Sequence, residues 1–317
     1  MYKSQPFLIS AAMLWALVTL IFFVLDATVN YRPPIAEDAL GSLLSAYLPV
    51  LALCVFLLLY LTRTRSPTEW ASDFHVNIER ARPELWLVCA YLLITQIGLG
   101  FFWNTGLHFP GPEVYERNTH HWHDVVRWML LNSVFYIVIP IYWLRRTGLR
   151  AADLLRSLEW RRNAWIIVAY WALDFFGPII SGVNFFSLSG QQYAVGVPTS
   201  IAANTIGAGL PVVLLMHVIL IPRLMVLFDC KLTVIILAGF FYAVFSLFDP
   251  GVDYSSAEAG ALSVTYIIMT QVLVGMGKAT FTVVTGNPLI HFITLHVLSA
   301  RIPFDTEMYA NVVAGFQ

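Results

Sequence analysis

Charge and cysteine are both scarce in this sequence, and the two shortages exclude several classes of protein. Only 12% of the 317 residues are charged, whereas soluble domains average about 25%. The formal net charge is −1, so the chain lacks the excess of positive charge with which nucleic-acid-binding proteins attract phosphates. The three cysteines, Cys54, Cys89 and Cys230, lie in or beside apolar runs and share no motif, which argues against a disulfide framework or a zinc knuckle.

Hydrophobic residues, by contrast, make up 58% of the chain, above the roughly 45–50% of soluble domains. They fall in blocks of about 18–25 residues, the length that a helix needs to cross a hydrocarbon core of about 30 Å. The blocks lack the two-residue alternation of membrane β-barrel strands. The sequence therefore predicts an all-α integral membrane protein, with residues 1–317 forming one polytopic domain in the lipid bilayer.

We predict a bundle of eight or nine membrane-spanning helices. The first apolar run is longer than the core of a signal peptide, so we interpret it as a retained anchor. The last run is short and begins with Gly286-Asn287-Pro288, so a re-entrant segment there would leave eight spans. The nine ranges are residues 7–25, 44–62, 85–103, 126–144, 164–187, 203–222, 232–248, 260–283 and 286–300.

The distribution of Lys and Arg predicts the orientation of the chain. Cytoplasmic loops of membrane proteins carry an excess of these residues. Placing the N-terminus in the cytoplasm leaves only Arg32, Arg117, Arg127 and Arg301, of 18 Lys and Arg residues, in outer segments. We therefore predict a cytoplasmic N-terminus, and we expect a bacterial inner membrane because so many of the spans are flanked by arginine.

Ionisable side chains inside a span are the first candidates for function, because burying them in lipid is costly. His217 lies among Leu and Ile residues, where a histidine is more often a hydrogen-bonded core residue than a functional one. His291 and His296 are five residues apart, about 140° around an α-helix, so we expect them on different faces and not on one metal ion. We expect Lys278 to extend to the inner headgroups rather than to form a retinal Schiff base.

A predicted outer loop holds a run of histidines, Thr119-His120-His121-Trp122-His123-Asp124. Neutral imidazoles and carboxylates bind transition metals such as zinc, copper and iron. One hypothesis is therefore a transition-metal site, with Asp249 from the outer end of span 232–248 nearby. The other, which we rank first, is an interfacial belt of His and Trp side chains. The residues of the hypothetical metal site are His120, His121, His123 and Asp124.

Two stretches have the pattern of one membrane-protease family. The first is Trp143-Leu144-Arg145-Arg146-Thr147-Gly148-Leu149-Arg150-Ala151-Ala152-Asp153-Leu154. The second is Leu214-Leu215-Met216-His217-Val218-Ile219-Leu220-Ile221-Pro222-Arg223-Leu224. Both resemble the CPBP intramembrane proteases, the family of CAAX prenyl endopeptidases and bacteriocin-processing proteins. The resemblance covers residues 126–300 and implies a helical bundle with a polar cavity inside the membrane.

The same resemblance indicates what this chain lacks. The paired glutamates of the family fall at Val212 and Val213, and its arginine falls at His217. Its His-x-x-x-Asn motif aligns with His296 and Ala300, so only the histidine is present. Proteolysis in that family depends on a glutamate that activates water, and valine accepts no proton. The resemblance therefore implies a pseudoenzyme on a protease-like bundle.

Four functions stay open on this sequence. We rank first a non-catalytic scaffold or accessory subunit that binds other membrane proteins, because the acids are missing and 15% of the residues are aromatic. The second is an intramembrane hydrolase with a rearranged site of His217, His296 and Asp249. The third is a metal- or cofactor-dependent membrane enzyme that uses the outer histidines. The fourth is a transporter, because Gly177-Pro178 and Gly209-Leu210-Pro211 interrupt two spans.

Overall fold

The regular structure of this chain is helical. The computed structural model describes residues 4–29, 39–63, 74, 76–108, 121–149, 160–180, 184–228, 230–249, 252–297 and 301–314. Within these ranges the chain forms helices, turns and irregular segments, and no strand. The predicted all-α class is confirmed for this part of the chain. His120 of the predicted metal site and residues 150–154 of the protease-like motif lie outside the described residues.

In the described part of the chain, five helices are long and apolar enough to cross a membrane. They are Pro6–Thr28, Ile78–Trp103, Trp122–Arg146, Gly190–Leu227 and Ala257–Thr285. Four shorter apolar helices cover Leu48–Thr62, Asn163–Leu173, Lys231–Phe245 and Pro288–Val297. This set of apolar helices is compatible with a multi-pass membrane protein. The number of spans and the side on which the N-terminus lies stay predictions.

The chain divides into two compact units. The first comprises Met1–Gly106 and Met216–Gly286, and the second comprises Leu107–Leu215 and Asn287–Gln317. Each unit is therefore built from two separate stretches of sequence.

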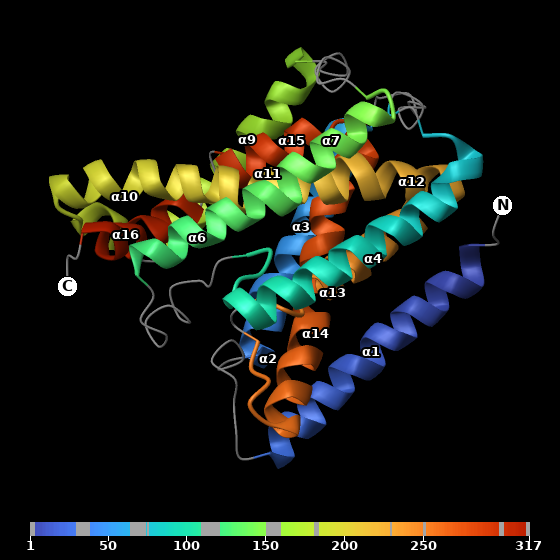
Figure 1. The fold of residues 1–317 in the computed structure, drawn as a ribbon, viewed down its shortest axis with the longest axis horizontal. Helices are drawn as coiled ribbons and strands as arrows, with labels where there is room; N and C mark the ends of the chain where they lie inside the picture. The colour runs from blue at the N-terminus through green and yellow to red at the C-terminus, as the bar shows by residue number, and fades with distance from the viewer. Residues whose placement is uncertain are drawn as a thin grey trace. The chain divides into compact units, whose positions relative to one another are not determined.

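The first unit is organised around α14. Helices α1, α3 and α13 all pack against it, and α4 packs against α12 (Figure 1). Phe22 and Leu43 join Leu262 and Met269 of α14 in one apolar cluster. The bounds of these elements are α1 (Ser4–Thr28), α2 (Ala39–Ser42), η2 (Leu43–Tyr47), α3 (Leu48–Thr62), α4 (Ile78–Trp103), α12 (Ile221–Leu227), α13 (Lys231–Phe245) and α14 (Ala257–Thr285).

Two glycines allow α13 and α14 to touch at their backbones. A Cβ atom on Gly275 would lie 2.9 Å from the Cα of Gly239, which is closer than real Cβ contacts come. A Cβ atom on Gly239 would lie 2.6 Å from the carbonyl oxygen of Val272. In lipid the hydrophobic effect does not drive helices together, so close van der Waals packing of small residues takes its place. This glycine pair therefore allows the close backbone contact of α13 and α14.

In the second unit, α10 and α16 lie side by side, and α6 packs against η6 (Figure 1). Trp128 of α6 fills the space over Gly207, where a Cβ atom would overlap the indole ring. The bounds are α6 (Trp122–Asn132), η4 (Ser133–Val138), α7 (Ile139–Arg146), α9 (Trp160–Ile180), η5 (Asn184–Ser187), α10 (Gly190–Ala202), η6 (Ala203–Gly209), α11 (Leu210–Val212), α15 (Pro288–Phe292), η8 (Ile293–Val297) and α16 (Arg301–Ala314).

Four π-helical segments each end two residues before a proline. Proline lacks an N–H and its ring clashes with the carbonyl four residues earlier. In these wider turns the residue just before the proline donates to the carbonyl five residues back instead of four: Leu210 N donates to Thr205 O, and Ile139 N to Val134 O. The segments and their prolines are η2 with Pro49, η4 with Pro140, η6 with Pro211, and η7 (Val213–Leu220) with Pro222.

These turns change one predicted element. Residues 203–222 were expected to form a separate span, but they lie inside one continuous helix, Gly190–Leu227, of 38 residues. The Gly209-Leu210-Pro211 sequence does not interrupt it, because the π-helical turn of η6 accommodates the proline. A helix that the sequence does not predict, α16, follows the last predicted span.

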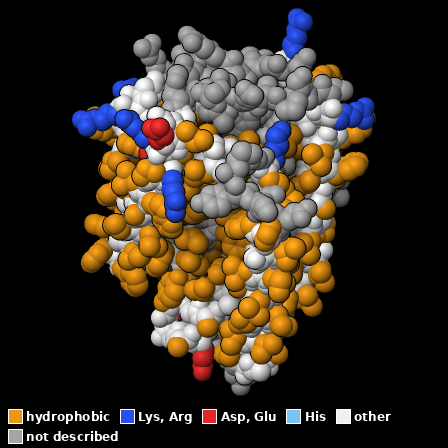
Figure 2. All heavy atoms as spheres, turned by 90° about the vertical axis from the view of Figure 1, so that its right-hand side faces the viewer, with side chains coloured by type: hydrophobic (Ala, Val, Ile, Leu, Met, Phe, Trp, Pro, Cys, Tyr) orange, Lys and Arg blue, Asp and Glu red, His pale blue; other side chains and the backbone are white. Residues whose placement is uncertain are grey.

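Much of the apolar surface faces outward. Hydrophobic side chains, in orange, make up most of the side chains that Figure 2 colours by type. On α1, side chains such as Met13, Leu17 and Leu20 are more than half exposed. On α4 the same holds for Trp86, and for Phe102 near the other end of the helix. Contiguous apolar surface of this extent is typical of a protein embedded in lipid.

Candidate functional site

His217 lies in η7, in the first unit, and its side chain is fully buried. Its Nδ1 lies 2.7 Å from the hydroxyl oxygen of Thr282 on α14, within hydrogen-bond distance. The adjacent residues Val218 and Ile219 are also buried. This contact ties η7 to α14, which is the behaviour of a core histidine.

Asp249 follows α13 at the other end of the first unit. The Asp249 carbonyl accepts from Val252 N at 3.0 Å, and Asp253 N donates to the Ser263 hydroxyl near the start of α14. Ser263 and Thr282, the partner of His217, are about 28 Å apart along α14 at 1.5 Å per residue. The structure therefore places Asp249 and His217 beside positions of α14 that are far apart along the helix, and it does not bring them into one site.

Asp249 packs instead against the segment that follows α4. A Cβ atom on Gly106 would lie 2.6 Å from the Cα of Asp249, so only glycine fits there. Tyr254 lies beside this turn and donates its hydroxyl to the carbonyl of Leu247. Burial raises the pKa of Tyr254, and the Asp249 carboxylate raises it further.

His296 belongs to the second unit, so its combination with His217 stays a prediction. The expected separation of His291 and His296, however, is wrong. Their ring centroids are 5.0 Å apart in an edge-on arrangement. The reason is η8, because a π-helical turn places residues five apart above one another, whereas the α-helical spacing of the prediction separates them. His296 also packs against Gly209, where a Cβ atom would lie 2.7 Å from the histidine Cβ.

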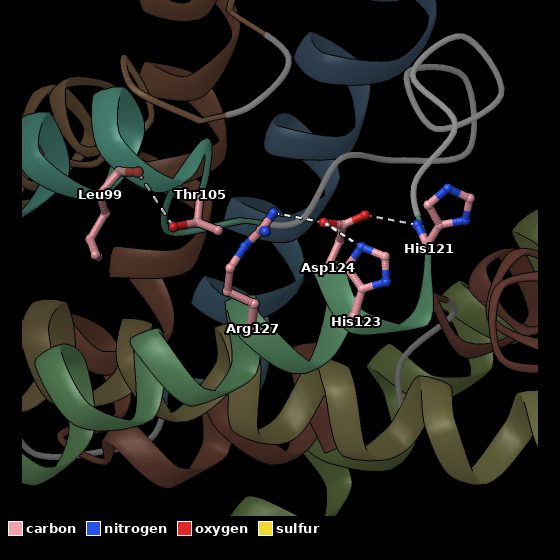
Figure 3. A network of polar contacts seen from close by, with 6 residues as sticks. All are labelled: Leu99, Thr105, His121, His123, Asp124 and Arg127. Carbon is pink, nitrogen blue, oxygen red and sulfur yellow. Dashed lines mark hydrogen bonds and ion pairs between the residues drawn. The ribbon is translucent and has the colours of Figure 1, made fainter.

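Asp124 of the outer histidine run stabilises the start of α6 (Figure 3). Its carboxylate accepts from His121 N at 2.8 Å and from Arg127 Nη2 at 2.7 Å. An acidic side chain in the first turn satisfies a free N–H and interacts favourably with the helix dipole. Figure 3 also draws the hydroxyl of Thr105, in the first unit, donating to Leu99 O.

Two histidines of this run, His121 and His123, lie close to each other. The rings of His121 and His123 are 5.3 Å apart, and His123 Nε2 lies 3.7 Å from Asp124 Oδ1. Among the described residues, no group of three His, Cys, Asp or Glu side chains is arranged to hold a metal ion. The predicted site with His120 therefore stays a prediction, since that residue is outside the described ranges.

Lys278 contacts an aromatic side chain of the neighbouring helix α13, and its extension toward the headgroups stays a prediction. Its amine donates to the hydroxyl of Tyr242 and lies 4.4 Å from the centre of that ring. A cation over an aromatic face is stabilised by the ring quadrupole. Lys278 thus contributes to the contact between α13 and α14.

Three polar contacts between helices were missed in the sequence. Asn132 donates to Gly207 O at 2.7 Å and to Leu107 O at 3.1 Å. Gly207 is four residues before Pro211, so its carbonyl is one that the proline leaves without a helical donor. Such an acceptor can be predicted from sequence, because it is the carbonyl of the residue four positions before a proline. The residues around Asn132, however, do not identify its side chain as the donor.

The other two contacts involve charged side chains. Arg223 pairs with Glu84 of α4, with Nη2–Oε2 and Nε–Oε2 distances of 2.8 and 2.9 Å. In the second unit, Asn204 Nδ2 lies 3.1 Å from Asp305 Oδ2. Asp305 was missed because it lies beyond the last apolar run, on α16.

The comparisons with known proteins add no relative. No protein-family model matches the sequence, and no curated protein or solved structure matches it either. The resemblance to the CPBP family therefore depends on the motifs of the sequence alone.

Proposed function

We propose that this chain is a non-catalytic scaffold or accessory subunit of a membrane complex, built on a protease-like helical bundle. The observation that carries the proposal is the burial of the Val212 and Val213 side chains, which are 1% and 3% exposed. These are the positions where the protease family places its glutamates. Buried valines occupy these positions inside the protein, and they provide no base to activate water.

The contacts of the polar groups agree with this proposal. His217 bonds to a threonine hydroxyl, Arg223 pairs with Glu84, and Asp124 holds the first turn of its own helix. Each contact fixes one helix or joins two, which is a structural task. The exposed aromatic and aliphatic side chains of α1 and α4 provide surface for lipid or for other membrane proteins.

The proposal includes a membrane topology. Five of the nine predicted ranges overlap helices long enough to cross a membrane and the other four overlap shorter apolar helices, so eight or nine spans require the shorter helices to cross or enter the membrane as well. A cytoplasmic N-terminus then places Arg63, Arg145 and Arg223 on the inner side. A bacterial inner membrane is the localisation we propose with it, and its support is the same charge distribution.

Native mass spectrometry of the protein released from its own membrane in a mild detergent tests this function. We expect an assembly in which the chain has partner subunits at a fixed stoichiometry. The His296→Ala variant serves as the matched comparison and should assemble as the wild type does. A chain recovered alone, with hydrolytic turnover that is lost in His296→Ala, would favour the hydrolase and contradict the scaffold.

A triple variant, His120→Ala, His121→Ala and His123→Ala, separates the metal hypothesis from the other two. The scaffold predicts no change in metal content or in assembly. A stoichiometric metal that is present in the wild type and lost in this variant would contradict the scaffold in favour of a metal enzyme.

A further inference from the structure

The first unit has a basic end, and α14 shows where it lies. Thr282, in the last turn of α14, lies 2.7 Å from His217. Arg223, six residues after His217, pairs with Glu84 near the start of α4. The start of α4 therefore lies toward the same end of the unit as the end of α14. Arg80 and Arg82 belong to this part of α4.

Helix α3 ends at the same end of the unit. Leu43, just before α3, packs in one cluster with Leu262 in the first half of α14. Leu51 of α3 lies 3.7 Å from the position of a Cβ atom on Gly277, in the second half of α14. Helix α3 therefore runs toward the end of α14. Arg63 follows Leu51 by twelve residues, or about 18 Å at 1.5 Å per residue.

The opposite end of the first unit is acidic. Asp253 N donates to the Ser263 hydroxyl near the start of α14, and Glu258 lies in the first turn of that helix. Asp26 lies one turn after Phe22, which packs against the first half of α14 (Figure 1). The described residues of this end include no Lys or Arg. The charge of the unit is thus polarised along its helices, and an anionic partner is attracted to one end only.

At the basic end, positive side chains border apolar surface. Arg63, Arg80 and Arg82 are all exposed. The Arg63 guanidinium lies 4.1 Å from the centre of the Tyr60 ring. Trp86, one turn after Arg82 on the same face of α4, is 68% exposed. Trp and Tyr are enriched where acyl chains meet headgroups, and the charged ends of Arg side chains extend from there into the headgroup layer.

The exposed arginines are open to an external partner, whereas Arg223 is not. Arg223 is buried, and Glu84 balances its charge. Glu79, exposed in the first turn of α4, offsets only one of the three exposed charges. Guanidinium groups form bidentate, charge-assisted hydrogen bonds with phosphate oxygens. A soluble anion would use the charges alone, but a phospholipid also uses the apolar surface beside them.

We propose that the basic end of the first unit binds the headgroups of anionic phospholipids in one leaflet. Arg63, Arg80 and Arg82 contact the phosphates, and Tyr60 and Trp86 lie beside the acyl chains. This inference goes beyond the scaffold function and needs no partner subunit, so either proposal can fail while the other stands.

Native mass spectrometry of the full chain in detergent tests this surface with two lipids of identical acyl chains, phosphatidylglycerol and phosphatidylcholine, offered in equal amounts. The wild type should retain phosphatidylglycerol in excess, because each basic residue near an anionic surface contributes about a fivefold preference. Arg82→Gln should lose about that factor. The triple variant Arg63→Gln, Arg80→Gln and Arg82→Gln should retain both lipids equally.

Two variants serve as controls. Arg127→Gln, in the second unit, changes the net charge as Arg82→Gln does and should keep the preference. Arg82→Lys keeps the charge and should keep most of it. The replaced side chains of the basic end are exposed, so these variants should fold as the wild type does.

Equal retention of the two lipids by the wild type, or an unchanged preference in the triple variant, would overturn the proposal. Glycerophosphoglycerol carries the same phosphate without acyl chains and should not compete. Displacement of the lipid by this compound would show a site for soluble anions and would overturn the proposal as well. The same holds for an acidic protein chain that binds in place of the lipid and is lost in the triple variant.

Discussion

Two helices of this chain are both strongly apolar, yet one is exposed and the other is buried. In the most apolar window of Pro6–Thr28 only 11% of the residues are buried inside the protein, against 78% for Gly190–Leu227. In water the more apolar helix would be the interior one. In lipid the tails are as apolar as leucine, so hydrophobicity does not decide which helix lies inside.

The two helices differ in their polar and small residues. The buried helix carries Ser200, Asn204 and His217, each of which contacts another side chain, and glycines over which Trp128 and His296 pack. On the exposed helix, the hydroxyl of Thr28 donates to the Val24 and Leu25 carbonyls of its own helix, and Trp15 Nε1 donates to the backbone carbonyl of Met269 on α14 at 2.9 Å. Polar contacts between side chains and close packing over glycines therefore distinguish the buried helix. Apolar composition determines only that both helices lie in the membrane.

The largest expected effect comes from the same truncation made on each helix. Leu220→Ala removes a side chain that is fully buried and should destabilise the protein by about 3 kcal/mol, because it leaves a cavity. Leu17→Ala removes one that is 53% exposed and should cost less than about 0.5 kcal/mol. Unfolding in mixed detergent micelles measures both, and equal losses would contradict the comparison.

Asn132→Leu tests whether polar contacts hold the interior helix. The variant removes the donor to Gly207 O and Leu107 O and should cost about 1–2 kcal/mol, since two buried carbonyls lose a partner. Thr28→Val on α1 is the control and should be neutral within about 0.5 kcal/mol. A loss no larger than that of the control would show that Asn132 does not secure the proline-containing segment.

Two glycines of α14 test how much the close backbone contact between α13 and α14 contributes to stability. Gly275→Ala places a methyl group against the Cα of Gly239 and should destabilise the protein by about 1–2 kcal/mol. Gly277→Ala meets only Leu51 Cδ1 at 3.7 Å, an ordinary contact, and should be neutral or stabilising by up to about 1 kcal/mol. If both variants unfold at the same denaturant concentration, the backbone contact between α13 and α14 is not a determinant of stability.

The smallest expected effect is on the pH dependence of stability, and it involves Tyr254, in the segment between α13 and α14. The pKa of Tyr254 is raised in the folded protein above its ordinary value of 10.0, so folding favours the neutral phenol. That contribution is complete below about pH 10 and is lost as the pH rises through the folded value. Tyr254→Phe should therefore flatten the loss of stability above about pH 10, and an unchanged alkaline profile would contradict the assignment.

The sequence is sufficient to predict the apolar helices, because their length and composition follow directly from the solvent in which they lie. It does not predict where Gly190–Leu227 begins or that Pro211 leaves it continuous, since both depend on π-helical turns. The same turns explain the wrong prediction for His291 and His296. Asp305 was missed for another reason: α16 is amphipathic, and the Asn204 side chain that Asp305 contacts lies about a hundred positions earlier in the chain.

The most direct test of the proposed membrane topology is a cysteine-accessibility experiment in intact cells, after replacement of the three native cysteines. Single cysteines at Asn104 and His121 should react with a membrane-impermeant maleimide. Those at Arg63 and Arg145 should react only once the membrane is opened. Labelling of all four positions in intact cells, or labelling of the two arginine positions first, would contradict the proposed topology.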